Sequence, residues 1–141
     1  MTLTGELFIG GQRSAREERF QAHDPASGAM IADVSFSVAA LDDVAAACAA
    51  AEAAFPLYAG LPLEDRARFL EAIADEIDAL GDTLTERAGR ESGLPAARLN
   101  GERGRTSGQF RLFAREVRDG VRAAWGITLV PEVNLVGVTL D

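Results

Sequence analysis

Several residue types that carry common enzyme chemistry are scarce or missing from this chain. All fourteen basic residues are arginine, so Schiff-base and lysine-nucleophile mechanisms are excluded. The single cysteine, Cys48, excludes an internal disulfide, and the single histidine, His23, leaves no cluster with the spacing of zinc ligands. Cys48 stands in an apolar repeat among alanines, which predicts a small core residue rather than a reactive thiol. We therefore expect no dedicated metal site.

A net positive charge and long apolar runs are also lacking. The formal net charge of −8 argues against nucleic acid, because phosphate binding depends on clustered arginine and lysine. No apolar run has the length of a membrane span, and the N-terminus has neither the basic region nor the apolar region of a signal peptide. A chain of 141 residues that is 48% hydrophobic suits one globular domain with a core. We expect a cytoplasmic protein with no membrane partner.

Recognisable catalytic motifs are absent as well. The sequence has no Gly-x-Gly-x-x-Gly after a strand, no phosphate loop with a lysine, and no Ser/His/Asp or Cys/His arrangement with a credible nucleophile. From the residues alone, the chain is an acidic and mostly helical domain.

Strands and turns are predicted for residues 1–36. Leu7–Ile9 is followed by Gly10-Gly11, and a second set of turn residues, 24–28, precedes the apolar stretch Met30–Phe36. These strands are too few for an independent sheet, so we expect a small hairpin that lies on helices.

Four helices are predicted for residues 37–120, over 41–55, 63–80, 83–90 and a long stretch after Pro95. Gly93 suits the left-handed position that ends a helix, and Pro95 suits the first turn of the next helix. Pro56 is expected to interrupt the first helix. The apolar repeat expected to face the core in that helix is Leu41, Val44, Cys48, Ala51 and Phe55.

The long helix has two faces of different character. Leu99, Thr106, Phe110, Phe113 and Val117 recur at helical spacing and are predicted to face the core, whereas Ala97, Gly101, Gly104 and Gly108 form a bare face. Each glycine in a helix interior costs roughly 1 kcal/mol relative to alanine. We expect close packing against another helix or strand to offset this cost, with close approach of a ligand as the alternative. The neighbouring Arg103 and Arg105 are solvated charges or, alternatively, anion anchors.

Residues 121–141 form an apolar tail. Trp125, Ile127 and Leu129 alternate before Pro131, and further apolar residues follow it, which predicts two short strands around a turn. Such a hairpin would need to be covered by other protein.

Six short motifs occur in the order that is typical of the N-terminal part of the aldehyde dehydrogenase superfamily, which the chain resembles from about Leu7 to Arg118. They are Ile9-Gly10-Gly11, Asp24-Pro25-Ala26-Ser27-Gly28, Asp43-Val44, Ala53-Ala54-Phe55, Leu63-Glu64-Asp65-Arg66-Ala67 and Glu91-Ser92-Gly93-Leu94-Pro95. Leu94 stands where most members have lysine, and the stretch 101–114 resembles the branch that oxidises α-ketoglutaric semialdehyde (2,5-dioxovalerate) to 2-oxoglutarate.

The resemblance implies part of the cofactor-binding domain of an α/β dehydrogenase, which as an isolated chain is mostly α with a small N-terminal β-hairpin. It implies NAD or NADP as the cofactor of the complete enzyme and a small aldehyde as its substrate. The long helix borders the substrate tunnel in relatives, so Arg105, with Arg103 or Gln109 as alternates, is the candidate to attract the substrate's carboxylate.

The resemblance also implies what this chain lacks. The family's cysteine nucleophile, glutamate base, oxyanion asparagine and nucleotide-binding unit lie further along than these residues, and Cys48 does not match the nucleophile's motif. We therefore expect no catalytic residue, no cofactor contact and no activity in the chain alone. The glycine face and the apolar tail would meet the rest of a dehydrogenase or another subunit of a homo-oligomer. The alternatives are a non-catalytic helical module that binds partner protein and a regulator that assembles with a full-length dehydrogenase.

Overall fold

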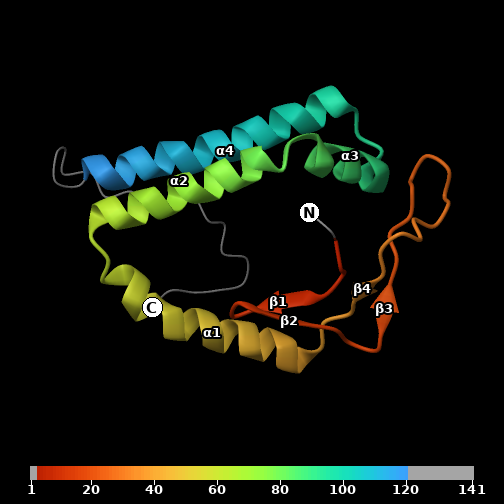
Figure 1. Ribbon diagram of the computed structural model, residues 1–141, viewed down its shortest axis with the longest axis horizontal. Helices are drawn as coiled ribbons and strands as arrows, with labels where there is room; N and C mark the ends of the chain where they lie inside the picture. Colours follow the sequence, from red (N-terminus) through yellow and green to blue (C-terminus); the bar gives the residue numbers. More distant parts are fainter. Residues whose placement is uncertain (1–2, 121–141) are drawn as a thin grey trace, which may run out of the picture.

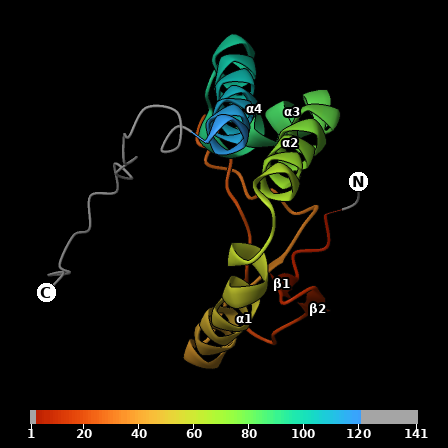
Figure 2. The ribbon, with the colours of Figure 1, turned by 90° about the vertical axis from the view of Figure 1, so that its left-hand side faces the viewer.

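The computed structural model describes residues 3–120 as a mostly helical chain with two small antiparallel strand pairs at its N-terminal end. Figure 1 shows α2 and α4 side by side, with α1 and the β1–β2 hairpin forming a second layer, and the view turned by 90° in Figure 2 agrees. The predicted fold class, helical with a small N-terminal hairpin, is confirmed. The elements are β1 (Leu7–Ile9), β2 (Gln12–Ser14), β3 (Arg19–Phe20), β4 (Phe36–Ser37), α1 (Leu41–Ala59), α2 (Leu63–Ala79), α3 (Gly81–Ser92) and α4 (Ala96–Asp119).

The β1–β2 hairpin forms where the turn residues predict it. Leu7 pairs with Ser14 and Ile9 with Gln12, so that Gly10 and Gly11 make the two-residue turn. Both glycines have positive φ, +58° and +80°, which is the conformation that such a turn requires and that other residues avoid. A Cβ atom on Gly10 would lie 3.6 Å from the Cβ atom of Ala50, so the hairpin rests on α1.

The second strand pair is much shorter than the sequence predicts. Of the stretch Met30–Phe36, only Phe36 lies in a strand, paired with Phe20, and His23 and Met30 form an isolated bridge. Asp33 is instead drawn to α3, where Arg87 and Arg90 lie at 2.9 and 2.8 Å from its two carboxylate oxygens. These two ion pairs fasten residues 19–37 to the helical layer.

The tightest packing is between α2 and α4, and small side chains make it. Ala67, Ala74, Ala114 and Ser107 are almost fully buried there, so the helix backbones approach closely. Arg111 adds ion pairs of 2.8 Å to Asp75 and to Asp78 across the helices. The predicted core face of the long helix is wrong for Thr106, which is exposed, and for Phe113, which is 53% exposed. Leu99, Phe110 and Val117 are half-buried.

The first helix forms as predicted but does not bury its apolar face. Leu41 is 88% exposed, Val44 53% and Phe55 65%, and Ala51 and Cys48 are also exposed, so the prediction of a core face with Cys48 in it is wrong. The reason is that, within residues 3–120, α1 packs chiefly against the small hairpin. Pro56 does not interrupt the helix, which continues to Ala59.

The start of α1 is fixed by an arginine from the strand region. The Arg16 guanidinium lies 2.6 and 2.8 Å from the two carboxylate oxygens of Asp43, and the Ala40 N–H donates to the same carboxylate at 2.9 Å. These donors hold the pKa of Asp43 below its usual value, with Arg16 the larger cause. Asp43 thereby supplies one half of a capping box, because its carboxylate accepts from the backbone N–H of the N-cap residue Ala40.

The residue predicted to end α3 is confirmed, but the helix is longer than predicted. Gly93 ends α3 with φ +70°, as predicted, while the helix starts two residues earlier and ends two residues later than the predicted 83–90. Pro95 lies directly before α4, whose first residue is Ala96.

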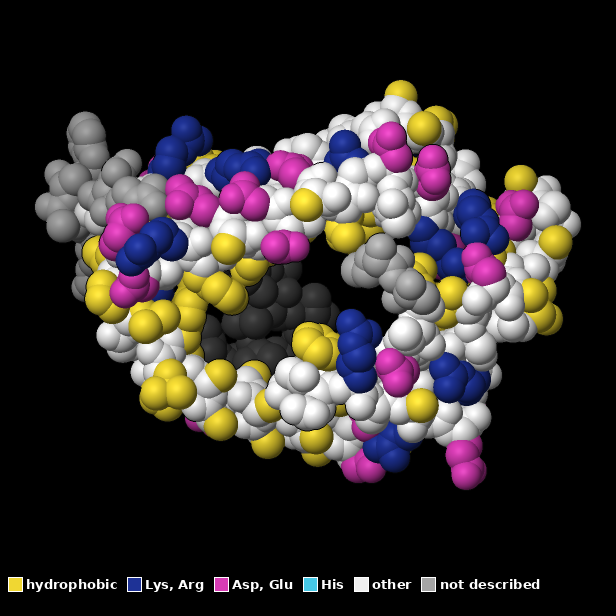
Figure 3. Space-filling view, viewed as in Figure 1, with side chains coloured by type: hydrophobic (Ala, Val, Ile, Leu, Met, Phe, Trp, Pro, Cys, Tyr) yellow, Lys and Arg dark blue, Asp and Glu magenta, His cyan; other side chains and the backbone are white. Residues whose placement is uncertain are grey.

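A large share of the apolar surface stays open. Leu41, Leu57, Phe8 and Phe55 are each at least 65% exposed. Among the described residues, no large side chain is fully buried. Figure 3 shows hydrophobic side chains on the walls of the hollow between the α1 layer and the α2–α4 layer. Within residues 3–120, no helix combines the length and apolar character needed to cross a bilayer.

Candidate functional site

The three residues predicted to bind substrate all lie on α4, but they do not share one side of it. Successive residues of an α-helix are about 100° apart, so Arg105 and Gln109 lie about 40° apart and Arg103 lies about 200° from Arg105. Arg105 and Gln109 are exposed, whereas Arg103 is half-buried and its Nη1 atom is buried with no hydrogen-bond partner among residues 3–120. The structure therefore groups Arg105 with Gln109 and separates Arg103 from them.

Arg103 belongs to the contact between α2 and α4. Its positive charge contributes to holding the pKa of Asp78 below the usual value, although the larger causes are the Ser107 hydroxyl and the Arg111 guanidinium. Two arginines and a serine thus surround one carboxylate of α2. This arrangement explains Arg103 as a packing and charge partner of α2.

The glycine face of α4 is open. Cβ atoms built on Gly101, Gly104 and Gly108 would find no heavy atom within 4 Å among the described residues, so the close packing expected from the sequence is absent there. Arg105 borders this face, about 40° around the helix from Gly101 and about 60° from Gly108. A strip of backbone without side chains, with a cation at its edge, leaves room for other protein or for a small anionic molecule.

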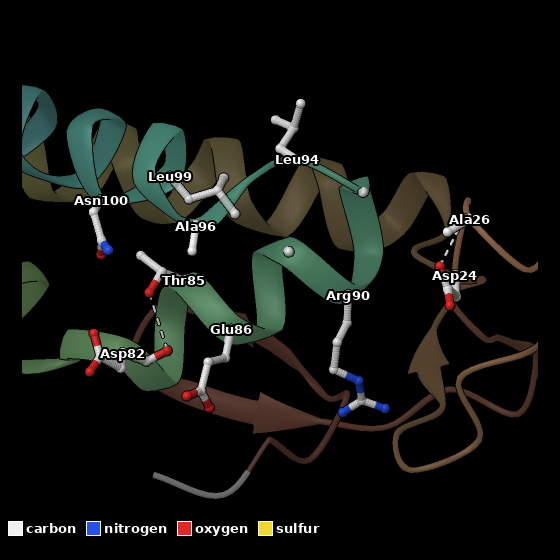
Figure 4. Close-up of a pocket in the computed structure, with 12 residues that line it drawn as sticks. Asp24, Ala26, Asp82, Thr85, Glu86, Arg90, Leu94, Ala96, Leu99 and Asn100 are labelled. Atoms are coloured by element: carbon white, nitrogen blue, oxygen red, sulfur yellow. Dashed lines mark hydrogen bonds between the residues drawn. The ribbon is translucent and has the colours of Figure 1, made fainter.

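An open depression of ≈ 580 Å³ lies between α3, the start of α4 and the turn at residues 24–28 (Figure 4). Its charged side chains are Asp24, Asp82, Glu86 and Arg90. Asp24 accepts hydrogen bonds from the Ala26 N–H and the Ser27 hydroxyl, both at 2.8 Å, which hold its pKa below the usual value. Because these bonds build the turn, Asp24 is a structural carboxylate.

Two of the family-like motifs, Asp24–Gly28 and Glu91–Pro95, meet in space at the edge of this depression. Gly93, from Glu91–Pro95, lies against Pro25, from Asp24–Gly28, and a Cβ atom on Gly93 would come 3.0 Å from the Pro25 Cγ atom. Only glycine combines that contact with φ +70° at low cost. The two motifs therefore join the N-terminal segment to the end of α3.

Within residues 3–120, no group of three His, Cys, Asp or Glu side chains could hold a metal ion. The Cys48 thiol is exposed on α1, and Arg90 in the depression is ion-paired with Asp33.

Comparisons with known proteins agree with the fold and with the motifs. Residues 12–127 match the model of the aldehyde dehydrogenase family. The chain is 58% identical over 121 residues to alpha-ketoglutaric semialdehyde dehydrogenase 2 of Azospirillum brasilense, which covers 85% of this chain and 23% of that protein. The structure is similar to that of PnpE in complex with nicotinamide adenine dinucleotide, with a TM-score of 0.73 and 26% identity, covering 94% of this chain and 26% of PnpE.

A shorter likeness points to a different enzyme. Over 42 residues, which are 30% of this chain and 11% of the other protein, the chain is 52% identical to UDP-N-acetylenolpyruvoylglucosamine reductase of Cutibacterium acnes. The chain spans about a quarter of the length of the Azospirillum dehydrogenase and of PnpE. Since the family model matches most of the chain, including both motifs that meet at Gly93, this protein belongs to the aldehyde dehydrogenase family.

Proposed function

We propose that this chain is the N-terminal scaffold of an NAD(P)+-dependent dehydrogenase that oxidises α-ketoglutaric semialdehyde to 2-oxoglutarate. The observation that carries the proposal is the 58% identity to the Azospirillum semialdehyde dehydrogenase over 121 residues. The bound dinucleotide of PnpE supports NAD as the first cofactor to test, with NADP as the alternative. The reductase likeness is confined to 42 residues and carries no proposal of that activity.

The isolated chain is expected to be inactive. The family mechanism needs a thiolate, a glutamate base and a bound nicotinamide held together, and positioning of that kind supplies roughly 7 to 11 kcal/mol of the barrier. Purified chain incubated with the semialdehyde and either nucleotide should form no NADH or NADPH. Turnover that is abolished by Cys48→Ala would contradict the proposal, because it would make the exposed thiol of α1 the nucleophile.

A chimera tests the scaffold role directly. Residues 3–120 replace the matching segment of the Azospirillum enzyme, and the parent enzyme serves as the control. Because the segment supplies fold and not chemistry, we expect the chimera to keep most of the parent's kcat and its preference for α-ketoglutaric semialdehyde. A folded chimera that prefers uncharged aldehydes would contradict the proposed substrate.

Within this proposal, Arg105 attracts the substrate's carboxylate, and Gln109 and Arg103 remain the alternates. Arg105 is favoured because it is exposed beside the open glycine face, whereas Arg103 is turned toward α2. A hydrogen bond to a charged group contributes about 1.5–3 kcal/mol, so Arg105→Ala in the chimera should raise KM for the semialdehyde about tenfold or more. KM for an uncharged aldehyde should stay unchanged. Arg98→Ala, an exposed arginine of the same helix paired with Glu102, is the matched control.

The exposed apolar surface favours one alternative function. A helical module that binds partner protein, or a regulator of a complete dehydrogenase, would also leave Leu41, Phe55 and Leu57 open for contact. Light scattering and a thermal melt separate these cases. A monomer with a cooperative melt favours the module, whereas an aggregating or molten species favours part of a larger enzyme or of an oligomer.

A further inference from the structure

The contact between α2 and α4 is made by small side chains, which specify the rotation of α4 about its own axis only weakly. Ala67, Ala74 and Ala114 are fully buried, and among the described residues no large side chain is. Large side chains that interdigitate normally fix how one helix is turned against another. Alanines let the two backbones approach but offer few such contacts. The rotation of α4 must therefore be fixed by another contact.

Ser107 makes such a contact. It is 2% exposed, and its hydroxyl donates to the Asp78 carboxylate of α2, which is the largest cause of the lowered pKa of Asp78. A hydrogen bond to a charged acceptor is about twice as strong as one to a neutral acceptor. The hydroxyl also lies 3.3 Å from the Gly104 carbonyl oxygen, but that long contact within α4 cannot fix α4 against α2.

The two arginines around Asp78 contribute less to this fixing. Arg111 lies 2.8 Å from Asp78, but both side chains are 41% exposed, and an exposed ion pair contributes little because water screens it. Arg103 acts on Asp78 through its charge alone, and its Nη1 atom has no hydrogen-bond partner within residues 3–120. A single buried polar contact can fix the register of packed helices, and Ser107 is the most deeply buried of the three groups around Asp78.

Ser107 lies midway between Arg105 and Gln109 in the sequence, two residues from each. At about 100° per residue, the two side chains lie about 160° to either side of Ser107, so both are on the side of α4 that faces away from α2. A rotation of α4 by about 20° would move an atom about 6 Å from the axis by about 2 Å. Binding groups need to be held within about 0.5 Å of the productive geometry.

We propose that Ser107 is a positioning residue, whose hydrogen bond to Asp78 sets the rotation of α4 and so the direction in which Arg105 and Gln109 point. The rotation itself is independent of any activity. The consequence for the carboxylate of the semialdehyde rests on the proposed function.

The rotation can be measured in the full chain as a distance between two spin labels. One label is on Ala72→Cys of α2 and the other on Gln109→Cys of α4, both at exposed positions, and Cys48→Ser removes the native thiol. We expect one narrow distance distribution. Ser107→Ala keeps the helix, because alanine is a good helix former, and should shift or broaden the distribution by about 2 Å or more. Asp78→Ala should do the same.

Thr106→Ala is the matched control, because its exposed hydroxyl donates within α4, to the Glu102 carbonyl oxygen at 2.9 Å. Asp75→Ala is the second control, because it removes an ion pair with Arg111 from a carboxylate that is 71% exposed. Both should leave the distribution unchanged, and circular dichroism should show that every variant keeps its helices. An unchanged distribution in Ser107→Ala would overturn the proposal. So would a broad distribution in the parent chain, or controls that shift as much as Ser107→Ala.

The chimera with the Azospirillum enzyme measures the consequence for the substrate. Ser107→Ala should raise KM for α-ketoglutaric semialdehyde several-fold, though no more than Arg105→Ala does, and should leave kcat and KM for an uncharged aldehyde unchanged. The double variant should show no further rise, because Ser107 acts through Arg105. An unchanged KM in Ser107→Ala, or a further rise in the double variant, would overturn this role. If Arg105→Ala alone left KM unchanged, the proposed substrate contact would fail, and the spin-label distances would still decide whether Ser107 sets the rotation of α4.

Discussion

The α2–α4 pair and the α1 helix make an instructive comparison, because both carry alanines and apolar residues at helical spacing. The pair buries Ala67, Ala74 and Ala114 completely and adds ion pairs across the helices. In α1, Leu41, Val44 and Phe55 are more exposed than buried. Apolar periodicity therefore identifies a helix and its apolar side, but a neighbouring element decides whether that side becomes core.

The largest expected difference in the free energy of unfolding is between substitutions of one alanine in the α2–α4 pair and one in α1. Ala74→Leu inserts three carbon atoms into a fully buried site and should lower the free energy of unfolding by about 1–3 kcal/mol. Ala51→Leu, on the exposed side of α1, should change it by less than about 0.5 kcal/mol. Urea unfolding followed by circular dichroism measures both. Equal losses in the two variants would mean that α1 is packed as tightly as the pair.

Replacing two glycines by alanine should change the stability of the fold in opposite directions, which sharpens the comparison of packed and open regions. Gly93→Ala should destabilise the fold by about 1–2 kcal/mol because a side chain is strained at positive φ. The contact with Pro25 adds to that loss. Gly104→Ala, in the open face of α4, should stabilise the fold by about 0.5–1 kcal/mol because a helix favours alanine. Thermal melts of the two variants suffice. If Gly104→Ala destabilised the isolated chain, the glycine face would be in contact with other protein.

A smaller effect is expected where the N-terminal segment is tied to α3. Asp33→Asn removes both ion pairs to Arg87 and Arg90, so the amides of Ser37 and Val38 should exchange faster with deuterium. Asp65→Asn, which removes only the local pair with Arg68, should leave these amides unchanged. Unchanged exchange in Asp33→Asn would show that other contacts hold the segment, such as Gly93 with Pro25 and Arg87 over the Phe36 ring.

The same tie predicts a pH dependence with a definite sign. Arg90 first, and then Arg87, hold the pKa of Asp33 below its usual value. Its contribution to stability is therefore complete above the unfolded value of about 3.9 and is lost as the pH falls through the lower folded-state value. Exchange at Ser37 and Val38 should accelerate in that acidic range in the parent chain more than in Asp33→Asn.

The smallest effect tests the exposure of α1 itself. Cys48→Ser should change the free energy of unfolding by less than about 0.5 kcal/mol, because the side chain is on the surface. The thiol of the parent chain should react completely with Ellman's reagent in the absence of denaturant. A protected thiol would show that α1 is covered in solution.

Local signals predicted much of this fold. The hairpin followed from Gly10-Gly11, the end of α3 from Gly93, and the positions of the four helices from apolar spacing, because each depends on residues close together in the sequence. The burial of α1 and the choice of buried face on α4 could not be predicted in the same way. Both depend on which elements meet, and single-residue patterns do not encode that.

In the candidate site too, features set by local sequence could be predicted, and features set by contacts between elements could not. The closeness of Arg105 and Gln109 follows from their four-residue spacing alone. The separation of Arg103 follows from the helical period too, but its electrostatic effect on Asp78 could be found only once the position of α2 was known. The ties of Arg16 to Asp43 and of Arg87 to Asp33 have no sequence signal, since 27 and 54 residues separate the partners.

The tie between Arg90 and Asp33 joins residues 57 positions apart, and this has a consequence for synthesis on the ribosome. A growing chain presents residues 3–37 well before α3 exists, so the first segment made must wait, unanchored, for its partner. The closing of that long loop is then a late event, after the local helices have formed. A slow codon or a chaperone that acts between the emergence of β4 and that of α3 would influence the yield of folded protein more than one that acts within any helix.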